Sequence, residues 1–413
     1  MKAGRRFPVE TAAGLWYDEY NFAGTAPAPQ AAGWKEGILM EQRQKRTWAE
    51  IDLSALDHNY RALRAMLPAG CRFLGVVKAN AYGHGSLAVA RRLEQLGADY
   101  LAVACIDEAA ELRVSGITAP ILVLGPTPIP LSAEPVRLRL TQSVGDLESA
   151  KALSAAAQAE GRPVKVHVKV DTGMSRLGFV CDEDHMADTV EQIAAVCALP
   201  GLEAEGIFTH FSDADSSEEF TMLQFTRFLD LLEALKGRGI TFAIRHCAAS
   251  SATLKFPCTH LDMVRPGLAL YGHYPDPSCE GLDGPGLQPV MRLCTRVAAV
   301  RTVPAGSYVS YGRTAQLDRE TSLAVLPIGY ADGFFRVLSN QGAVSIHGVS
   351  RPIVGRVCMD LSMVDAGEDV QVGDVATVYG PEQPVEAAAA LAGTIPYELL
   401  SAVSRRVPRI YRG

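Results

Sequence analysis

The chain has 413 residues, 48% of them hydrophobic and 21% charged, and it carries a formal net charge of −7. It is long enough for two or three domains with well-buried cores. Because the net charge is negative and no long run of Lys and Arg occurs, nucleic acids and anionic membranes are disfavoured as partners, and a small-molecule ligand is favoured.

Cysteine usage and hydropathy indicate the compartment. The nine cysteines are scattered without C-x-x-C pairs or His-rich spacing, so neither a disulfide framework nor a metal site is predicted. No apolar run approaches the ~18 residues needed to span a bilayer, and the N-terminus lacks the apolar core of a signal peptide. We therefore expect a cytoplasmic protein with reduced thiols.

The N-terminal segment differs from the rest of the chain. Residues 1–45 are rich in Gly, Ala and Pro and show no sustained period of 2 or 3.6, so we predict an unstructured extension. Regular patterning begins near Thr47. Met40 lies just before it, and one hypothesis is that translation begins there. The alternative is a genuine flexible extension.

The stretch 73–85, FLGVVKANAYGHG, follows a predicted helix whose N-cap is Ser54. It is typical of a buried strand that leads into Lys78, after which two glycines form a turn before a new helix at Ser86. An amine at the mouth of a strand can be partly desolvated, which lowers its pKa and suits it to Schiff-base chemistry. On this stretch alone, an ordinary strand-end lysine is the alternative.

Short apolar runs then alternate with amphipathic segments of helical length. The runs are 73–78, 100–104, 121–125, 139–144, 164–170, 204–210, 243–248 and 262–266. Alternating strands and helices imply parallel strands joined by right-handed crossovers, and eight such units predict an α/β fold with a closed (β/α)8 barrel over residues 46–280. A doubly wound open sheet is the alternative, but no G-x-G-x-x-G follows the first strand.

The patterning changes beyond about Gly286. Short alternating runs, CTRVAAV, SLAVLPIGY, AVSIHG, PIVGRVCM and VATVYG, are separated by Gly, Pro, Asn and Asp. This pattern predicts a separate mainly-β domain over residues 281–413. The Pro- and Gly-rich stretch 274–286 is a plausible linker between the two domains.

Polar residues follow several of the predicted barrel strands. Catalytic groups of such barrels come from the carboxyl ends of the strands, and phosphate is often held after strands 7 and 8. The residues in question are Lys78, Lys169, Arg176, His210, Ser250, Ser251, Arg265 and Gly267. Each has an ordinary explanation by itself. Together they predict a phosphate-bearing ligand held by Ser250 and the Gly267 backbone, with Lys78 facing its reactive carbon.

A series of motifs carries a family resemblance. In chain order they are KANAYGHG, VDTGMSRLG, THF, VRPGLALYG, VSYGRT, GYADG, GRVCMD and RVPRIY, and they span residues 47–411. The series resembles that of the bacterial alanine racemases. The resemblance implies a pyridoxal 5'-phosphate barrel and a homodimer in which the C-terminal domain completes the partner's site. It also implies conversion of L-alanine to D-alanine for peptidoglycan.

The resemblance assigns two bases. Lys78 matches the Schiff-base lysine, which also acts on one face of the substrate Cα, and Tyr311 matches a base reaching in from the partner subunit. Two bases explain racemisation physically, because a planar carbanion can be reprotonated from either face only if a proton carrier stands on each side.

Other positions match by the same resemblance. Tyr82, Ser250, Gly267, Leu268 and Tyr397 correspond to phosphate-binding residues; His210 packs against the cofactor ring; Arg265 contacts the pyridine nitrogen and His246 is its partner; Arg176 contacts the phenolic oxygen and the substrate; Met359 meets the substrate carboxylate; Lys169 is carbamylated in many members; and Tyr330 lines the mouth of the site.

Three positions depart from the family pattern or bear on specificity. Ala249 stands where many members have asparagine, and Ser175 stands where glycine is frequent before Arg176. Tyr397 is larger than its counterpart in relatives that handle serine, which favours alanine as substrate. The alternatives are a serine or broad-specificity racemase and, more remotely, a non-catalytic pyridoxal-phosphate carrier or a decarboxylase.

Overall fold

The computed structural model of the protein describes residues 46–279 and 286–413. The predicted extension over residues 1–45 and the hypothesis of a start at Met40 therefore lie outside the described residues, as do residues 280–285 of the predicted linker 274–286.

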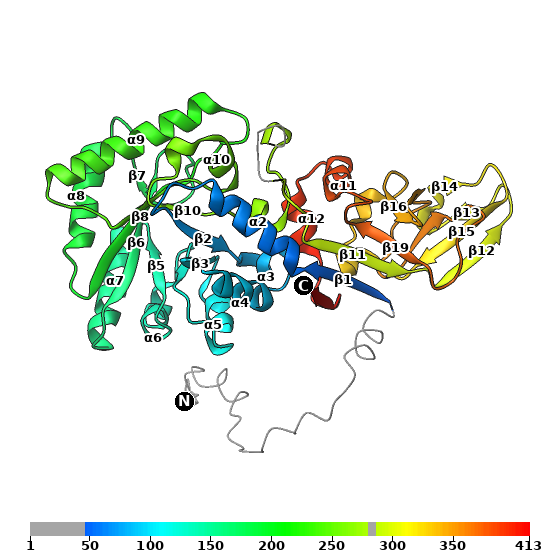
Figure 1. The fold of residues 1–413 in the computed structure, drawn as a ribbon, viewed down its shortest axis with the longest axis horizontal. Coiled ribbons are helices and arrows are strands. Elements are labelled where there is room, and N and C mark those ends of the chain that lie inside the picture. The colour runs from blue at the N-terminus through cyan, green and yellow to red at the C-terminus, as the bar shows by residue number, and fades with distance from the viewer. Residues whose placement is uncertain (1–45, 280–285) are drawn as a thin grey trace, which may run out of the picture. The chain divides into compact units, whose positions relative to one another are not determined.

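A parallel sheet of eight principal strands forms the first part of the described chain (Figure 1). The strands are β2 (Arg72–Val76), β3 (Tyr100–Val103), β4 (Ile121–Val123), β5 (Thr141–Val144), β6 (Val164–Asp171), β8 (Leu202–Phe208), β9 (Ile244–His246) and β10 (Met263–Val264). Their order is β10-β2-β3-β4-β5-β6-β8-β9, and a parallel bridge between Ala249 and Arg265 joins the segments after β9 and β10. The predicted (β/α)8 barrel is confirmed.

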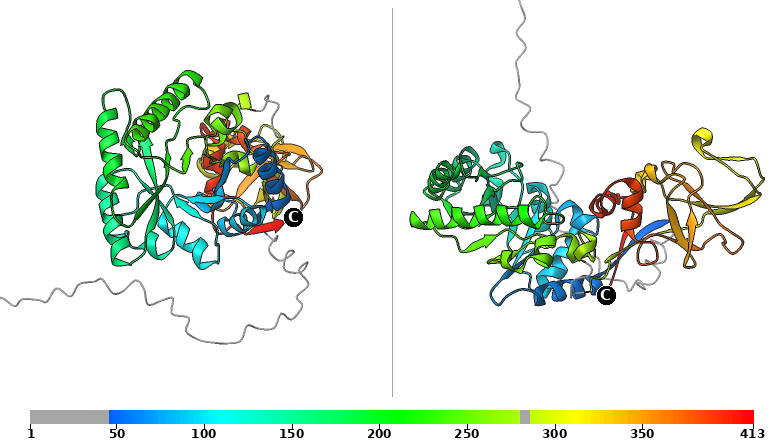
Figure 2. Two further views of the ribbon diagram at one scale, coloured as in Figure 1. Left: turned by 60° about the vertical axis from the view of Figure 1, so that its left-hand side comes forward. Right: turned by 90° about the horizontal axis from the view of Figure 1, so that it is seen from above.

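Helices lie outside the barrel strands (Figures 1 and 2). They include α4 (Ser86–Leu96), α5 (Ile106–Val114), α6 (Glu134–Arg137), α7 (Leu147–Ala159), α8 (Met186–Cys197), α9 (Glu218–Gly237) and α10 (Ser250–Lys255). Val89, Ala90 and Leu93 of α4 are fully buried, in keeping with one apolar face turned to the sheet. The helix predicted from Ser86 is confirmed.

The helix predicted from Ser54 is α2 (Leu53–Ala65), and its predicted cap is wrong by two residues. The N-cap is Asp52, whose carboxylate accepts hydrogen bonds from the N–H groups of Ser54 and Ala55. A carboxylate satisfies two of the free N–H groups of the first turn and complements the positive end of the helix dipole. Asp52 is therefore a more favourable N-cap than Ser54.

The C-terminal region is mainly β, as predicted. One sheet has the order β17-β16-β19-β11-β1-β20, and a three-stranded sheet has the order β12-β15-β18. The bounds are β11 (Met291–Arg296), β12 (Ala299–Val303), β13 (Tyr308–Val309), β14 (Ala315–Gln316), β15 (Thr321–Leu326), β16 (Ala343–Ile346), β17 (Val349–Pro352), β18 (Ser362–Asp365), β19 (Val375–Tyr379) and β20 (Arg409–Arg412), with helices α11 (Val385–Ala392) and α12 (Pro396–Ala402). Strand β1 (Thr47–Asp52) precedes the barrel in the chain but pairs with β11 and β20 in this sheet.

The run PIVGRVCM is an exception, because most of it is not a strand. Strand β17 ends at Pro352, and the chain then runs without regular structure to β18. Gly355 has φ +80°, and a Cβ there would lie 2.6 Å from the carbonyl oxygen of Val309. The strand pattern is therefore broken where the backbone turns and packs tightly, which places Cys358 and Met359 on a loop.

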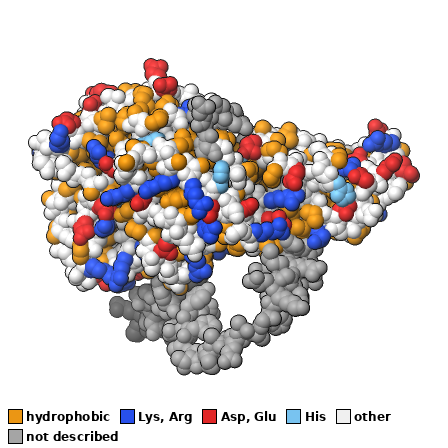
Figure 3. Space-filling view, in the orientation of Figure 1, with side chains coloured by type: hydrophobic (Ala, Val, Ile, Leu, Met, Phe, Trp, Pro, Cys, Tyr) orange, Lys and Arg blue, Asp and Glu red, His pale blue; other side chains and the backbone are white. Residues whose placement is uncertain are grey.

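One face of the described surface carries side chains of both charges. In the face drawn in Figure 3, Lys and Arg side chains are interspersed with Asp, Glu, hydrophobic and uncharged groups. Among the described residues, no helix combines the length and hydropathy needed to cross a bilayer.

The loop after β6 is wrapped around one carboxylate. Asp171 accepts hydrogen bonds from the backbone N–H groups of residues 173–176, at 2.9 to 3.1 Å. This wrapping holds Ser175 at φ +56°, in the left-handed region that disfavours residues with a Cβ. The conformation gives a physical reason for the glycine that the family resemblance implies at this position.

Replacing Ser175 with glycine should therefore stabilise the fold. Removing the Cβ relieves the left-handed strain, and we expect Ser175→Gly to raise the free energy of unfolding by about 1 kcal/mol in chemical denaturation. Ser175→Ala is the matched control, because it keeps the Cβ and should bring no such gain. Equal stability of the Gly and Ala variants would contradict this explanation.

Candidate active site

One cavity of about 560 Å³ opens at the carboxyl ends of the barrel strands. It collects Tyr397 of helix α12 and nearly all of the barrel residues singled out by sequence: Lys78, Tyr82, Lys169, Arg176, His210, Ser250, Ser251, Arg265, Gly267 and Leu268. Parallel strands bring their carboxyl ends to one rim, which is why residues so far apart in the chain meet here.

Lys78 follows the first barrel strand. It lies two residues beyond the end of β2 and is half-buried. Burial, followed by the positive charges of Arg176 and Arg265, lowers the pKa of its amine, while Glu108 opposes this effect. The lysine therefore has the partly desolvated, cation-flanked setting that favours a neutral, nucleophilic amine.

The backbone after Lys78 forms a left-handed turn, in the segment labelled α3 (Lys78–Tyr82). The residues 79–82 have φ between +51° and +55°. Four consecutive residues with a Cβ in this region are costly, at roughly 1 to 2 kcal/mol each. Such strain persists only where the surroundings enforce it, and it concentrates at functional sites.

Three side chains hold this turn. The carboxylate of Glu108, in the first turn of α5, accepts a hydrogen bond from the Ala79 N–H at 2.6 Å. The amide oxygen of Asn80 accepts one from the Ser86 N–H at 2.9 Å. The Nδ1 atom of the fully buried His84 lies 2.9 Å from the carbonyl oxygen of Ala81. Sequence reasoning missed these roles.

The turn brings Tyr82 to a tight cradle of small and polar groups. Ser250 Oγ accepts hydrogen bonds from the N–H groups of Gly267, at 2.9 Å, and Ala269, at 3.3 Å. A Cβ at Gly267 would lie 2.4 Å from the Tyr82 hydroxyl oxygen, so only glycine fits. The ring of Tyr397 lies 5.9 Å from that of Tyr82. The cradle thus offers hydroxyl groups and backbone N–H groups close together, which suits a phosphate.

Arg265 lines the cavity and is 4% exposed. Its guanidinium donates to His246 Nδ1 at 3.0 Å, to His210 Nδ1 at 3.1 Å, and to the carbonyl oxygens of Thr209 and Cys247, both at 3.0 Å. No carboxylate of the described residues forms a direct ion pair with it within the usual distance. Burial lowers its pKa to about 10, so it remains a cation at neutral pH.

The neighbouring histidines are neutral. Burial and then the charge of Arg265 hold the pKa values of His210 and His246 well below their ordinary range. Because a guanidinium only donates, the nitrogen that faces Arg265 in each ring must be the unprotonated one.

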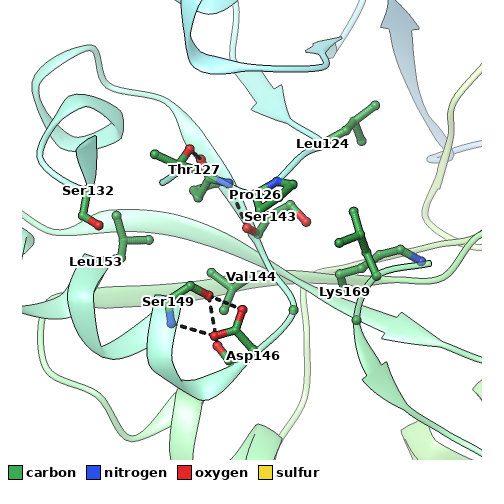
Figure 4. A pocket seen from close by; sticks show the side chains of 14 residues that line it. Leu124, Pro126, Thr127, Ser132, Ser143, Val144, Asp146, Ser149, Leu153 and Lys169 are labelled. Atoms are coloured by element: carbon green, nitrogen blue, oxygen red, sulfur yellow. Dashed lines mark hydrogen bonds between the residues drawn. The ribbon is translucent and has the colours of Figure 1, made fainter. Parts of the chain in front are cut away.

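Lys169 projects from β6 into the same region. Its amine donates to the Val170 carbonyl oxygen at 2.9 Å and lies 5.1 Å from the centre of the Phe208 ring. Burial and then Arg265 lower its pKa to about 7. Figure 4 shows a smaller neighbouring pocket, in which the Lys169 amine points away from Asp146; that carboxylate accepts a hydrogen bond from the Ser149 N–H at the start of α7.

The remaining predicted site residues lie elsewhere. Tyr311, Met359 and Tyr330 do not line the cavity and are 72%, 54% and 43% exposed. They are held near one another in the C-terminal region. The N–H groups of residues 330 and 331 donate to the carbonyl oxygens of Cys358 and Met359, both at 3.0 Å. Ser310, next to Tyr311, donates to the Arg356 carbonyl oxygen at 2.7 Å. Exposed large side chains grouped in this way are typical of an interaction surface.

Comparison with known proteins places the chain among relatives. The family model described as "Alanine racemase, N-terminal domain" matches residues 51–275, and "Alanine racemase, C-terminal domain" matches residues 290–411. The alanine racemase of Desulforamulus reducens is 46% identical over 89% of this chain and 99% of its own length. That of Desulfovibrio desulfuricans is 47% identical over 88% and 97%.

Solved structures agree. The alanine racemase of Clostridium difficile 630 has a TM-score of 0.84 at 39% identity, covering 89% of this chain and 96% of its own. That of Streptomyces coelicolor A3(2) has a TM-score of 0.85 at 38% identity, covering 90% and 99%. Both the sequence matches and the shared fold extend over the barrel and the C-terminal region, and the chain therefore belongs to the alanine racemase family.

Proposed function

We propose that this enzyme interconverts L-alanine and D-alanine with pyridoxal 5'-phosphate as cofactor, using Lys78 and Tyr311 as its two bases. The observation that carries the proposal is the cavity itself, which is lined by a lysine whose pKa is lowered, by the hydroxyl and backbone N–H groups around Ser250, and by a buried arginine. The alanine racemases to which this chain is similar support the choice of substrate. We propose that the enzyme works in the cytoplasm and that its physiological role is to supply D-alanine for peptidoglycan synthesis.

The residues present fit this cofactor. Ser250, Gly267 and the Tyr82 hydroxyl would hold the phosphate, with Leu268 and Tyr397 beside them, and the Lys78 amine would bind the aldehyde carbon. When bound, the cofactor withdraws electrons from the substrate Cα and so acidifies its proton. Arg265 would face the pyridine nitrogen. Because it remains protonated at neutral pH, it can donate a hydrogen bond there without giving up its proton.

Lys78 would exchange the proton on one face of Cα. Its lowered pKa favours a neutral amine that can accept this proton and return it. Arg176, on the loop wrapped around Asp171, would contact the cofactor's phenolic oxygen and the substrate. His210 and His246 would support the ring and Arg265 as neutral groups.

A second proton carrier is required on the other face, and Tyr311 is the candidate. Since it is exposed and lies outside the cavity of its own chain, we propose a homodimer in which Tyr311 completes the cavity of the partner subunit. Met359 would meet the substrate carboxylate in the same way, and Tyr330 would line the mouth of the site.

Racemisation of alanine and serine, measured side by side, tests the proposal. With pyridoxal phosphate present, the purified chain should convert L-alanine to D-alanine at least tenfold faster than L-serine, because we expect the bulky Tyr397 side chain, which lines the cavity, to leave less room for the hydroxymethyl group of serine. Comparable turnover of serine would move the assignment to a broad-specificity racemase. Turnover of neither amino acid, with cofactor bound at Lys78, would contradict the proposal.

Lys169 is a candidate for carbamylation. Carbamate forms from the neutral amine and carbon dioxide, and a pKa of about 7 makes that form abundant at neutral pH. An ordinary lysine, with a pKa near 10.4, would be almost entirely protonated there. A carbamate would replace a buried amine by an anion among the cations Arg176 and Arg265, which would favour it electrostatically.

Carbamylation should therefore rise with pH in a specific window. At constant dissolved ¹³CO₂, the neutral amine of Lys169 increases about tenfold between about pH 6 and pH 8, because its pKa is lowered and not raised. We expect a carbamate signal in ¹³C NMR that grows over this window and disappears in Lys169→Arg. A signal that persists in that variant, or none at any pH, would contradict the assignment.

A further inference from the structure

A column of polar side chains continues below the cavity, inside the barrel. Beneath Arg265 lie His246 on β9 and His167 on β6, both fully buried, and then Glu205 on β8. The interior of such a barrel is ordinarily filled by branched apolar side chains. Polar groups in this position are costly unless every one of them is hydrogen-bonded, so their presence calls for an explanation.

The column is a continuous chain of contacts. Arg265 Nη1 lies 3.0 Å from His246 Nδ1, and His246 Nε2 lies 2.8 Å from His167 Nδ1. His167 Nε2 lies 3.5 Å from a carboxylate oxygen of Glu205, which is the longest link. The chain thus joins the cation at the cavity to a carboxylate at the opposite end of the barrel interior.

The residues at the two ends of this hydrogen-bonded series, Arg265 and Glu205, determine which ring nitrogen of each histidine carries the proton. Arg265 can only donate, so His246 Nδ1 accepts and its proton sits on Nε2. That N–H donates to His167 Nδ1, so the His167 proton also sits on Nε2. The carboxylate of Glu205 can only accept, which fits the Nε2–H of His167. All three hydrogen bonds therefore point in one direction, from Arg265 to Glu205.

The charge states agree with this direction. Burial lowers the pKa of His167 and, with Arg265, that of His246, so both imidazoles are neutral. Burial raises the pKa of Glu205, but hydrogen bonds from His167, Lys165 and Tyr100 outweigh it and lower the pKa to about 2. The carboxylate is thus ionised at neutral pH.

The local backbone is arranged to place Glu205. The pairing of β6 with β8 shifts register between Val166 and His167, so that Ala204 and Gly206 face successive β6 residues and Glu205 is left unpaired. A bulge of this kind redirects a side chain. Gly206 leaves room for the relay, because a Cβ there would lie 2.8 Å from ring atoms of His167. The His246 ring is stacked on Phe208, with centres 4.7 Å apart.

We propose that Glu205 is a positioning residue for the cofactor site, acting through His167 and His246 to hold Arg265 in place. It does so by fixing the tautomers of the two histidines, so that His246 always presents an acceptor to the guanidinium. The proposal rests on the proposed function for the role of Arg265 toward pyridoxal phosphate. The tautomers themselves are independent of catalysis.

The isosteric substitution Glu205→Gln should reverse the donor-to-acceptor direction of these hydrogen bonds. Lys165 and Tyr100 donate to different oxygens of the Glu205 carboxylate. In Glu205→Gln, the ammonium of Lys165 requires the amide oxygen, so the NH₂ group faces His167. That group donates to His167 Nε2 and forces both histidines into the other tautomer. His246 would then point an N–H at the Arg265 guanidinium, and their contact would be lost.

Lys165→Met is the matched control. Both variants remove the ion pair between Lys165 and Glu205, which is half exposed on the lysine side. Only Glu205→Gln changes the acceptor that faces His167. A role in ion pairing alone would make the two variants alike, whereas a role in tautomer control separates them.

The first readout is ¹⁵N NMR of histidine-labelled protein, which distinguishes the two tautomers. We expect His167 and His246 to carry their protons on Nε2 in the wild type and in Lys165→Met, and on Nδ1 in Glu205→Gln. The wild-type spectrum can contradict the proposal even if Glu205→Gln fails to fold. A proton on Nδ1 of either ring in the wild type overturns the proposal.

The second readout is the dissociation constant for pyridoxal phosphate, measured by titrating the cofactor-free protein. We expect it to rise about tenfold in Glu205→Gln and to stay unchanged in Lys165→Met. Equal weakening in both variants, or inverted tautomers with unchanged affinity, would overturn the proposal. If the protein proves not to racemise alanine, the NMR outcome still stands, so the two failures are distinguishable.

Discussion

The rest of the site depends on the electrostatic effect that the buried, positively charged guanidinium of Arg265 has on the groups around it. It contributes to the lowered pKa values of Lys78, Lys169, His210 and His246. A single cation fixed in a low-dielectric space thus favours neutral amines and imidazoles around it and an anionic ligand above it. Its own charge is satisfied by two imidazole nitrogens and two carbonyl oxygens, and the nearest carboxylate along that hydrogen-bonded path is the remote Glu205.

Strained backbone conformations position the reactive groups. The left-handed turn after Lys78 and the left-handed residue before Arg176 are each held by a carboxylate that accepts backbone N–H groups, Glu108 in one case and Asp171 in the other. Neither carboxylate is among the groups that we propose to take part in the reaction. The cost of these conformations is offset by the surrounding packing and hydrogen bonds, as is common at sites that must be rigid before a ligand binds.

Much of this could be read from the sequence, and the remainder has physical causes. Period and alternation indicated the barrel, because each strand is a short buried run between amphipathic helices. The motifs gave the residues that line the cavity. The pairing of β1 with the C-terminal sheet could not be read, since one short strand carries no record of its partners. The relay through His167 was also missed, because it depends on a register shift that places Glu205 inside the barrel.

The most direct test of the account is whether Lys78 and Tyr311 of one chain belong to two different active sites of the proposed dimer. Lys78→Ala and Tyr311→Phe each disable a different half of the proposed shared site, so each variant should be nearly inactive as a homodimer. When the two are unfolded together and refolded as a mixture, half of the dimers are mixed and each has one intact site. The account predicts recovery of about a quarter of the wild-type alanine racemase activity. No recovery from a mixture that forms dimers would contradict it.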